Sequence, residues 1–106
     1  MQAPFEVDVT TAAQMMIEGA LLLDVREPHE FAFCAVAGSR HIPMRRIPES
    51  TQELPPDRPV LVLCHHGGRS QQVAHFLRAH GFPRATNVAG GIDAWADRID
   101  PSLARY

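Results

Sequence analysis

The chain has 106 residues, of which 45% are hydrophobic and 21% are charged, and its formal net charge at pH 7 is −2. This length suits one core, so we expect residues 1–106 to form a single domain. The small negative charge offers no positive field for a phosphate backbone, which argues against a nucleic-acid partner. We find no apolar run of membrane-spanning length and no secretory leader, and therefore expect a cytoplasmic protein with no membrane partner.

Five segments are predicted strands: residues 5–9, 21–25, 41–42, 60–64 and, more weakly, 85–88. The runs that begin at Leu21 and Val60 are apolar without alternation, which is typical of strands covered on both faces. Helical spacing predicts helices from Thr10 or Thr11 to about Gly19, and over residues 70–80 and 92–99. Residues 47–59 contain four prolines and are predicted as a loop with at most one short helical turn.

The alternation of strands and helices predicts an α/β fold with an open, mostly parallel five-stranded sheet and helices on both faces. In such sheets the ligand site lies outside the carboxyl ends of the strands. Cys64 ends the predicted strand 60–64, so it falls at that edge. We therefore place the candidate site there.

The segment after this strand reads Cys64-His65-His66-Gly67-Gly68-Arg69-Ser70, and it turns directly into a predicted helix. Two glycines permit the positive φ angles of a tight turn, in which successive backbone N–H groups point inward and bind an anion. These N–H groups, the helix dipole and Arg69 favour a thiolate, so we expect the pKa of Cys64 to be lowered.

Such a thiolate can attack the outer sulfur of a donor, and the same N–H groups would hold the resulting persulfide anion. This chemistry needs neither an organic cofactor nor a metal. His65 and His66 are adjacent and do not easily converge on one ion, and the paired Cys and His spacing of structural zinc sites is absent from the sequence. Cys34 lies among small and apolar residues and is interpreted as a packing residue.

Three segments resemble the signatures of the rhodanese-like sulfurtransferases, in the same order along the chain. They are Leu23-Asp24-Val25-Arg26-Glu27-Pro28-His29-Glu30-Phe31, Cys64-His65-His66-Gly67-Gly68-Arg69-Ser70 and Asn87-Val88-Ala89-Gly90-Gly91-Ile92-Asp93-Ala94-Trp95. The chain departs from the family pattern after Phe31, where Cys34-Ala35-Val36 stands in place of a Gly-His-Ile step.

The resemblance implies a single rhodanese-like domain that moves sulfane sulfur from a donor such as thiosulfate to an acceptor such as cyanide or a thiol. It places the persulfide on Cys64 and substrate binding on His65, His66, Gly67, Gly68 and Arg69. Asp24, Arg26 and Ser70 are expected to support the structure. Donor and acceptor are small molecules or proteins, and the loop carries only one fixed positive charge, so thiosulfate could be a surrogate donor.

Two other functions are weighed against this one. A cysteine phosphatase has five residues between its cysteine and arginine, whereas four separate Cys64 from Arg69 here. A non-catalytic or sulfur-relay module of the same fold would act on protein partners. A module without catalysis would be expected to lose the nucleophile, yet Cys64, Arg69 and both glycines are retained.

Overall fold

The computed structural model describes residues 4–106 and is built on one five-stranded sheet in which every strand pairing is parallel. The strands are β1 (Glu6–Val7), β2 (Leu21–Asp24), β3 (Arg40–His41), β4 (Val60–Leu63) and β5 (Ala85–Val88). Their order across the sheet is β1-β5-β4-β2-β3. The predicted open parallel sheet is therefore confirmed, and β4, which leads to Cys64, is its central strand.

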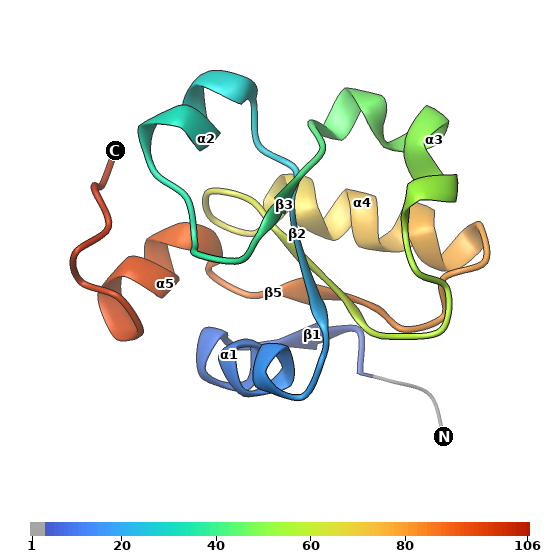
Figure 1. Cartoon of the computed structure of the whole chain (residues 1–106), viewed down its shortest axis with the longest axis horizontal. Coiled ribbons are helices and arrows are strands. Elements are labelled where there is room, and N and C mark those ends of the chain that lie inside the picture. Colours follow the sequence, from blue (N-terminus) through green and yellow to red (C-terminus); the bar gives the residue numbers. More distant parts are fainter. Residues whose placement is uncertain (1–3) are drawn as a thin grey trace.

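Five α-helices and two 3₁₀ helices accompany the strands, and the last of them, α5, follows β5 (Figure 1). They are α1 (Val9–Ile17), α2 (Pro28–Phe33), η1 (Met44–Arg46), α3 (Ile47–Ser50), η2 (Thr51–Glu53), α4 (Gly68–Ala79) and α5 (Gly91–Arg98). Among the described residues, none of these helices has the length and apolar character needed to span a membrane.

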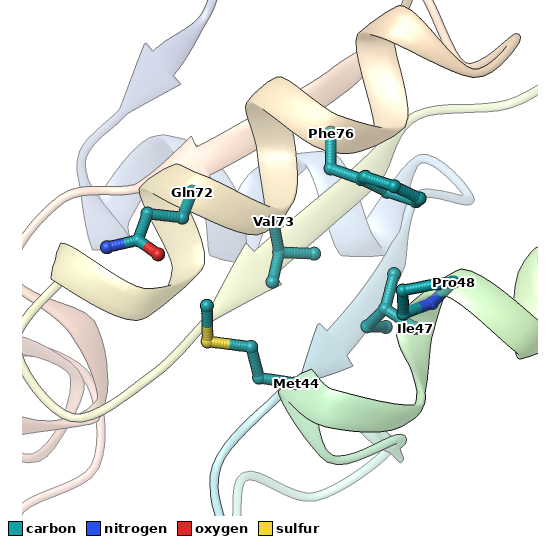
Figure 2. Close-up of a pocket in the computed structure, with 6 residues that line it drawn as sticks. All are labelled: Met44, Ile47, Pro48, Gln72, Val73 and Phe76. Atoms are coloured by element: carbon teal, nitrogen blue, oxygen red, sulfur yellow. The ribbon is translucent and has the colours of Figure 1, made fainter.

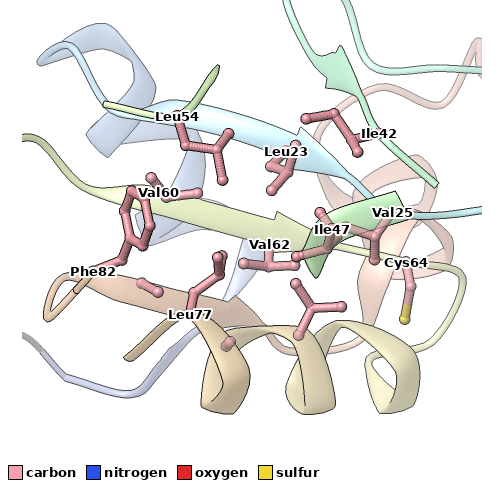
Figure 3. Close-up of a cluster of buried hydrophobic side chains, with 13 residues drawn as sticks. Leu23, Val25, Ile42, Ile47, Leu54, Val60, Val62, Cys64, Leu77 and Phe82 are labelled. Atoms are coloured by element: carbon pink, nitrogen blue, oxygen red, sulfur yellow. The ribbon is translucent and has the colours of Figure 1, made fainter. Parts of the chain in front are cut away.

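The sheet has a buried apolar cluster on each face, as its continuously apolar strands predict. Leu23 and Val62 pack on the face covered by α4 and α3, whereas Leu22 and Leu61 pack on the face covered by α1 and α5. Figure 1 shows these two helix pairs on opposite sides of the sheet, and Figure 3 shows the first cluster between β2, β4 and α4. Because side chains of β4 pack into both clusters, the strand is held on both faces and the position of Cys64 at its end is fixed.

Several boundaries differ from the sequence prediction. Helix α1 begins at Val9 because the Asp8 carboxylate accepts a hydrogen bond from the Thr11 N–H at 2.8 Å and caps the first turn. Helix α2 was not predicted. It starts with Pro28 at its first turn, and Glu27 and Glu30 form a capping box there. Residues 47–59, predicted as a loop with at most one short helical turn, contain two short helices, α3 and η2, and η1 directly precedes them.

Candidate active site

Cys64 follows the central strand directly, and its side chain is buried, with a residue exposure of 1%. Figure 3 shows its sulfur turned toward the first turn of α4. A residue at this position faces the carboxyl edge of the sheet, where parallel α/β folds bind ligands. Cys64 thus lies at the edge of the sheet where the sequence analysis places the candidate site.

Residues 64–69, which we call the Cys64 loop, bring hydrogen-bond donors to the sulfur. Gly67 has a φ of +115°, caps α4 and donates its N–H to Sγ at 3.1 Å. The Oγ atom of Ser70 lies 3.3 Å from Sγ. Burial disfavours the thiolate, but hydrogen bonds from Ser70, Gly67 and the His66 backbone outweigh it and lower the pKa of Cys64. The pKa of Cys64 is thus lowered, as expected from the sequence, and these hydrogen bonds are the cause.

The carbonyl groups of Cys64 and His65 point the other way, toward the start of α5. The N–H of Ile92 donates to the Cys64 carbonyl at 2.8 Å, and the N–H of Asp93 donates to the His65 carbonyl at 3.1 Å. A Cβ atom at Gly91 would clash with both carbonyl groups, so only glycine allows this approach. By fixing the carbonyls outward, α5 leaves the loop N–H groups free to face the sulfur.

Arg69 lies at the rim of the loop, but its guanidinium pairs with Glu30 of α2. Its two terminal nitrogens donate to the two carboxylate oxygens at 2.7 and 3.0 Å. This pairing lowers the pKa of Glu30 to about 2 and raises the pKa of Arg69. The one fixed positive charge of the loop is therefore compensated by a carboxylate, which the sequence did not reveal.

His65 and His66 form part of an aromatic stack over the loop. Their rings lie 3.9 Å apart, and the other face of His65 stacks on Tyr106, also at 3.9 Å. The Tyr106 hydroxyl donates to Glu30 at 2.8 Å and accepts from Arg26 at 2.9 Å. Burial, followed by the proximity of His66, lowers the pKa of His65, which disfavours a positive charge on this side chain.

Ligand atoms of His65, His66 and Asp93 lie within 4.8 Å of one another, so we tested this group as a metal site. The two rings are stacked with an interplanar angle of 27°, which leaves their in-plane lone pairs nearly side by side rather than convergent. Asp93 is already paired with Arg105 at 2.8 Å. These three residues do not present the convergent geometry that a transition metal requires.

Asp24 and Arg26 form a buried ion pair beside the site, and both side chains have an exposure of 0%. Their closest atoms are 2.7 Å apart. Arg26 also donates to the carbonyl oxygens of Glu30 and Cys34, at 3.2 and 2.6 Å. The pair therefore ties the end of β2 to the first turn of α2 at Glu30 and to Cys34, the residue that follows this helix. Cys34 and Cys64 are both free cysteines.

Three residues at the site were not singled out from the sequence. Glu30 pairs with Arg69, Tyr106 stacks on His65, and Asn87 accepts a hydrogen bond from Ser70 at 2.5 Å. Glu30 and Asn87 lie inside the matched signatures, so the sequence contained a signal for them. No pattern around Tyr106 indicates its contact with the loop.

An apolar hollow of about 240 Å³ opens between α4 and the segment formed by η1 and α3 (Figure 2). Gln72 is its one polar lining residue, and the others are Met44, Ile47, Pro48, Val73 and Phe76. None of the predicted site residues lines it. The hollow is therefore separate from the Cys64 loop, although Val73 belongs to the same buried cluster as Cys64.

Comparison with known proteins agrees with this geometry. The family model for the rhodanese-like domain matches residues 8–98. The chain is 38% identical over 101 residues to a sulfurtransferase of Allochromatium vinosum, with 93% of this chain and 94% of the relative covered. It is 34% identical over 84 residues to the thiosulfate sulfurtransferase GlpE of Tolumonas auensis, with 79% of both chains covered.

A longer relative and a solved structure complete the comparison. The chain is 38% identical over 96 residues to the chloroplastic rhodanese-like/PpiC domain-containing protein 12 of Arabidopsis thaliana, covering 87% of this chain but 32% of that protein. The crystal structure of a rhodanese-related protein from Thermoplasma volcanium superposes with a TM-score of 0.83 at 31% identity, covering 95% of this chain and 98% of that one. With the matched signatures and the Cys64 loop, these results show that the chain belongs to the rhodanese-like domain family.

Proposed function

We propose that this protein is a rhodanese-type sulfurtransferase that carries sulfane sulfur on Cys64. The single observation that carries the proposal is the set of donors around a buried sulfur: the Gly67 N–H at 3.1 Å and the Ser70 hydroxyl at 3.3 Å. The family membership shown above supports the same activity. His65, His66, Gly67, Gly68 and Arg69 form the loop that receives the transferred sulfur, and Asp24, Arg26 and Ser70 support it.

The reaction runs in two steps that balance without a cofactor. The Cys64 thiolate attacks the outer sulfur of thiosulfate, a new S–S bond forms, and sulfite leaves with the electron pair of the broken S–S bond. The negative charge now lies on the outer sulfur, within reach of the loop N–H groups. An acceptor such as cyanide then attacks that outer sulfur, leaves as thiocyanate, and regenerates the thiolate.

Intact-mass measurement tests this cycle. After incubation with thiosulfate, the protein should gain the mass of one sulfur atom, and cyanide should remove it. Cys64→Ser should show no gain, while Cys34→Ser, the matched control, should behave like the natural protein. Absence of the adduct with thiosulfate and with every other persulfide donor would overturn the proposal.

The identity of the donor and acceptor is the finer part of the proposal. Because Arg69 is compensated by Glu30, the loop attracts a dianion such as thiosulfate less than an unpaired arginine would. This observation favours, as a second candidate function, a sulfur relay in which the donor and acceptor are thiol persulfides or protein thiols. A comparison of kcat/KM for thiosulfate and for a low-molecular-weight persulfide separates the two, because the relay requires the persulfide to be preferred.

The cycle also requires Cys64 to remain a free thiol between turnovers. Cys34 and Cys64 are unpaired in the structure. A reducing, cytoplasmic setting for residues 1–106, acting as one domain, is therefore part of the proposal.

A further inference from the structure

The Ser70 hydroxyl, in the first turn of α4, lies between Sγ of Cys64 and a competing acceptor on Asn87. Its Oγ atom lies 3.3 Å from Sγ of Cys64 and 2.5 Å from Oδ1 of Asn87. Ser70 and Asn87 are buried, with exposures of 0% and 1%, so water does not replace either partner. A hydroxyl has one hydrogen, and it can donate to only one of these two atoms at a time.

The orientation of the Asn87 amide decides which atom receives that hydrogen. The Asn87 NH₂ group donates to the carboxylate of Glu6 at 2.8 Å, and a carboxylate can only accept, so the amide oxygen must face Ser70. Two oxygens 2.5 Å apart need a hydrogen between them, and Asn87 Oδ1 has none to give. While Cys64 is an uncharged thiol, the hydroxyl hydrogen of Ser70 therefore points at Asn87, and it becomes a donor to Sγ only once the thiolate forms.

This arrangement suits an uncharged Cys64. The thiol S–H can donate to Ser70 Oγ while the Ser70 hydroxyl donates to Asn87, and every hydrogen is used. When the thiol proton leaves to solvent, the hydroxyl must rotate toward Sγ to stabilise the thiolate, and the buried Asn87 oxygen then loses its donor. An unsatisfied buried acceptor is unfavourable, so part of what the thiolate gains is lost at Asn87.

We propose that Asn87, held by Glu6, is a positioning residue that keeps the Ser70 hydroxyl hydrogen away from Cys64 while its sulfur is uncharged, and so opposes thiolate formation. In the persulfide the charge sits on the outer sulfur, Sγ is uncharged again, and the hydroxyl returns to Asn87. Asn87 thus favours both the thiol and the persulfide over the free thiolate, which leaves the thiolate less stabilised and more nucleophilic.

Other titratable groups also surround the sulfur, and the test holds them constant. They are Arg69 on α4, Glu30 on α2, Asp93 on α5, Asp24 at the end of β2, Arg26 after it, His65 and His66 in the loop, and Tyr106 stacked on His65. The Asn87 substitutions below change none of them. The inference concerns the nucleophile of the proposed function, but alkylation needs no sulfur donor, so the two proposals can fail separately.

The decisive measurement is the rate of Cys64 alkylation by iodoacetamide as a function of pH. Asn87→Leu removes the acceptor and frees the hydroxyl for Sγ. A hydrogen bond to a charged group is worth about tenfold in the ionisation equilibrium, and the lower nucleophilicity of a more acidic thiolate offsets about half of this on a logarithmic scale. We expect alkylation roughly threefold faster on the acidic limb of the profile.

The Ser70→Ala background supplies the control for a merely structural effect. Without the hydroxyl, Asn87→Leu should leave the profile unchanged. A slower or unchanged rate for Asn87→Leu alone, or an equal acceleration in the Ser70→Ala background, would overturn the proposal.

A second variant covers the case in which Asn87→Leu does not fold. Glu6 is exposed on β1, and Glu6→Gln removes the acceptor that fixes the amide orientation, so Asn87 can turn its NH₂ group toward Ser70. Glu6→Gln should then also speed alkylation. The acceleration must disappear with Ser70→Ala; if it persists there, loss of the Glu6 charge explains it and the proposal is wrong.

Discussion

Arg69 donates from both terminal nitrogens to the carboxylate of Glu30, 39 positions earlier in the chain. The positive charge of Arg69 at the rim of the Cys64 loop is thus balanced by the negative charge of Glu30. It raises the local potential less than a free arginine would, and it couples the acidity of Cys64 to a carboxylate on a different helix.

We expect Glu30→Gln to strengthen binding of thiosulfate. The substitution leaves Arg69 uncompensated, and one more positive charge near a dianion is worth roughly threefold to tenfold in affinity. The KM for thiosulfate in the cyanide assay should fall by this factor. Glu27→Gln is the matched control because Glu27 belongs to the same capping box but pairs with Arg45, and it should leave KM unchanged. An unchanged KM for Glu30→Gln would contradict the electrostatic role of the pair.

We expect Arg69→Ala to raise the pKa of Cys64. Removal of the guanidinium leaves the Glu30 carboxylate uncompensated near the sulfur, which disfavours the thiolate. The midpoint of the alkylation profile should move to higher pH. In the double variant with Glu30→Gln the midpoint should return toward its original value, and a midpoint that stays high would mean that Arg69 acts on Cys64 without Glu30.

Much of the fold could be predicted from the sequence because the sequence signals for its elements are local. The apolar strands β2 and β4 and the glycine-rich turn before α4 are each specified by neighbouring residues, so the central strand and its cysteine were predicted together. The capping box of α2 is also local, but Glu27 stands at the position usually taken by serine or threonine, which weakens the signal.

The long-range contacts of the site could not be predicted from the sequence. Tyr106 reaches Glu30 across 76 positions, and Ser70 reaches Asn87 across 17. Such pairs are set by how parallel strands bring the ends of distant connections to one edge of the sheet. The sequence showed that Arg69 belongs to the Cys64 loop, but it could not show which carboxylate would face it.

Acidification should weaken the fold through Glu30. Its pKa is lowered from 4.5 to about 2, chiefly by Arg69, so the ionised carboxylate stabilises the folded state above pH 4.5 and this contribution is lost as the pH falls toward 2. Since Arg69 is partly exposed, we expect a loss of about 1–2 kcal/mol. Urea unfolding between pH 7 and pH 3 should show a steeper loss for the natural protein than for Glu30→Gln. Equal slopes would rule out this contribution.

Gly91→Ala should impair catalysis more than an alanine substitution at a positive-φ glycine far from the site. The added Cβ meets the carbonyl groups of Cys64 and His65, so the loop must move away from α5. We expect a loss of about 1–3 kcal/mol in the free energy of unfolding, measured by urea denaturation, and at least tenfold lower kcat. Gly81→Ala is the control, because Gly81 also has a positive φ, +97°, but has no atom within 4 Å of an added Cβ. A similar kcat for both variants would contradict the role of Gly91.

The docking of α5 on the Cys64 loop also bears on when the thiol becomes reactive during folding. The carbonyls of Cys64 and His65 are fixed by N–H groups of Ile92 and Asp93, which lie 28 positions further along the chain in each case. Strand β5, which leads to them, fills the gap between β1 and β4. We therefore expect a nascent chain that has released Cys64 but not this segment to hold a less acidic cysteine. Its full acidity, and with it the risk of premature oxidation, should develop when the last strand and helix complete the sheet.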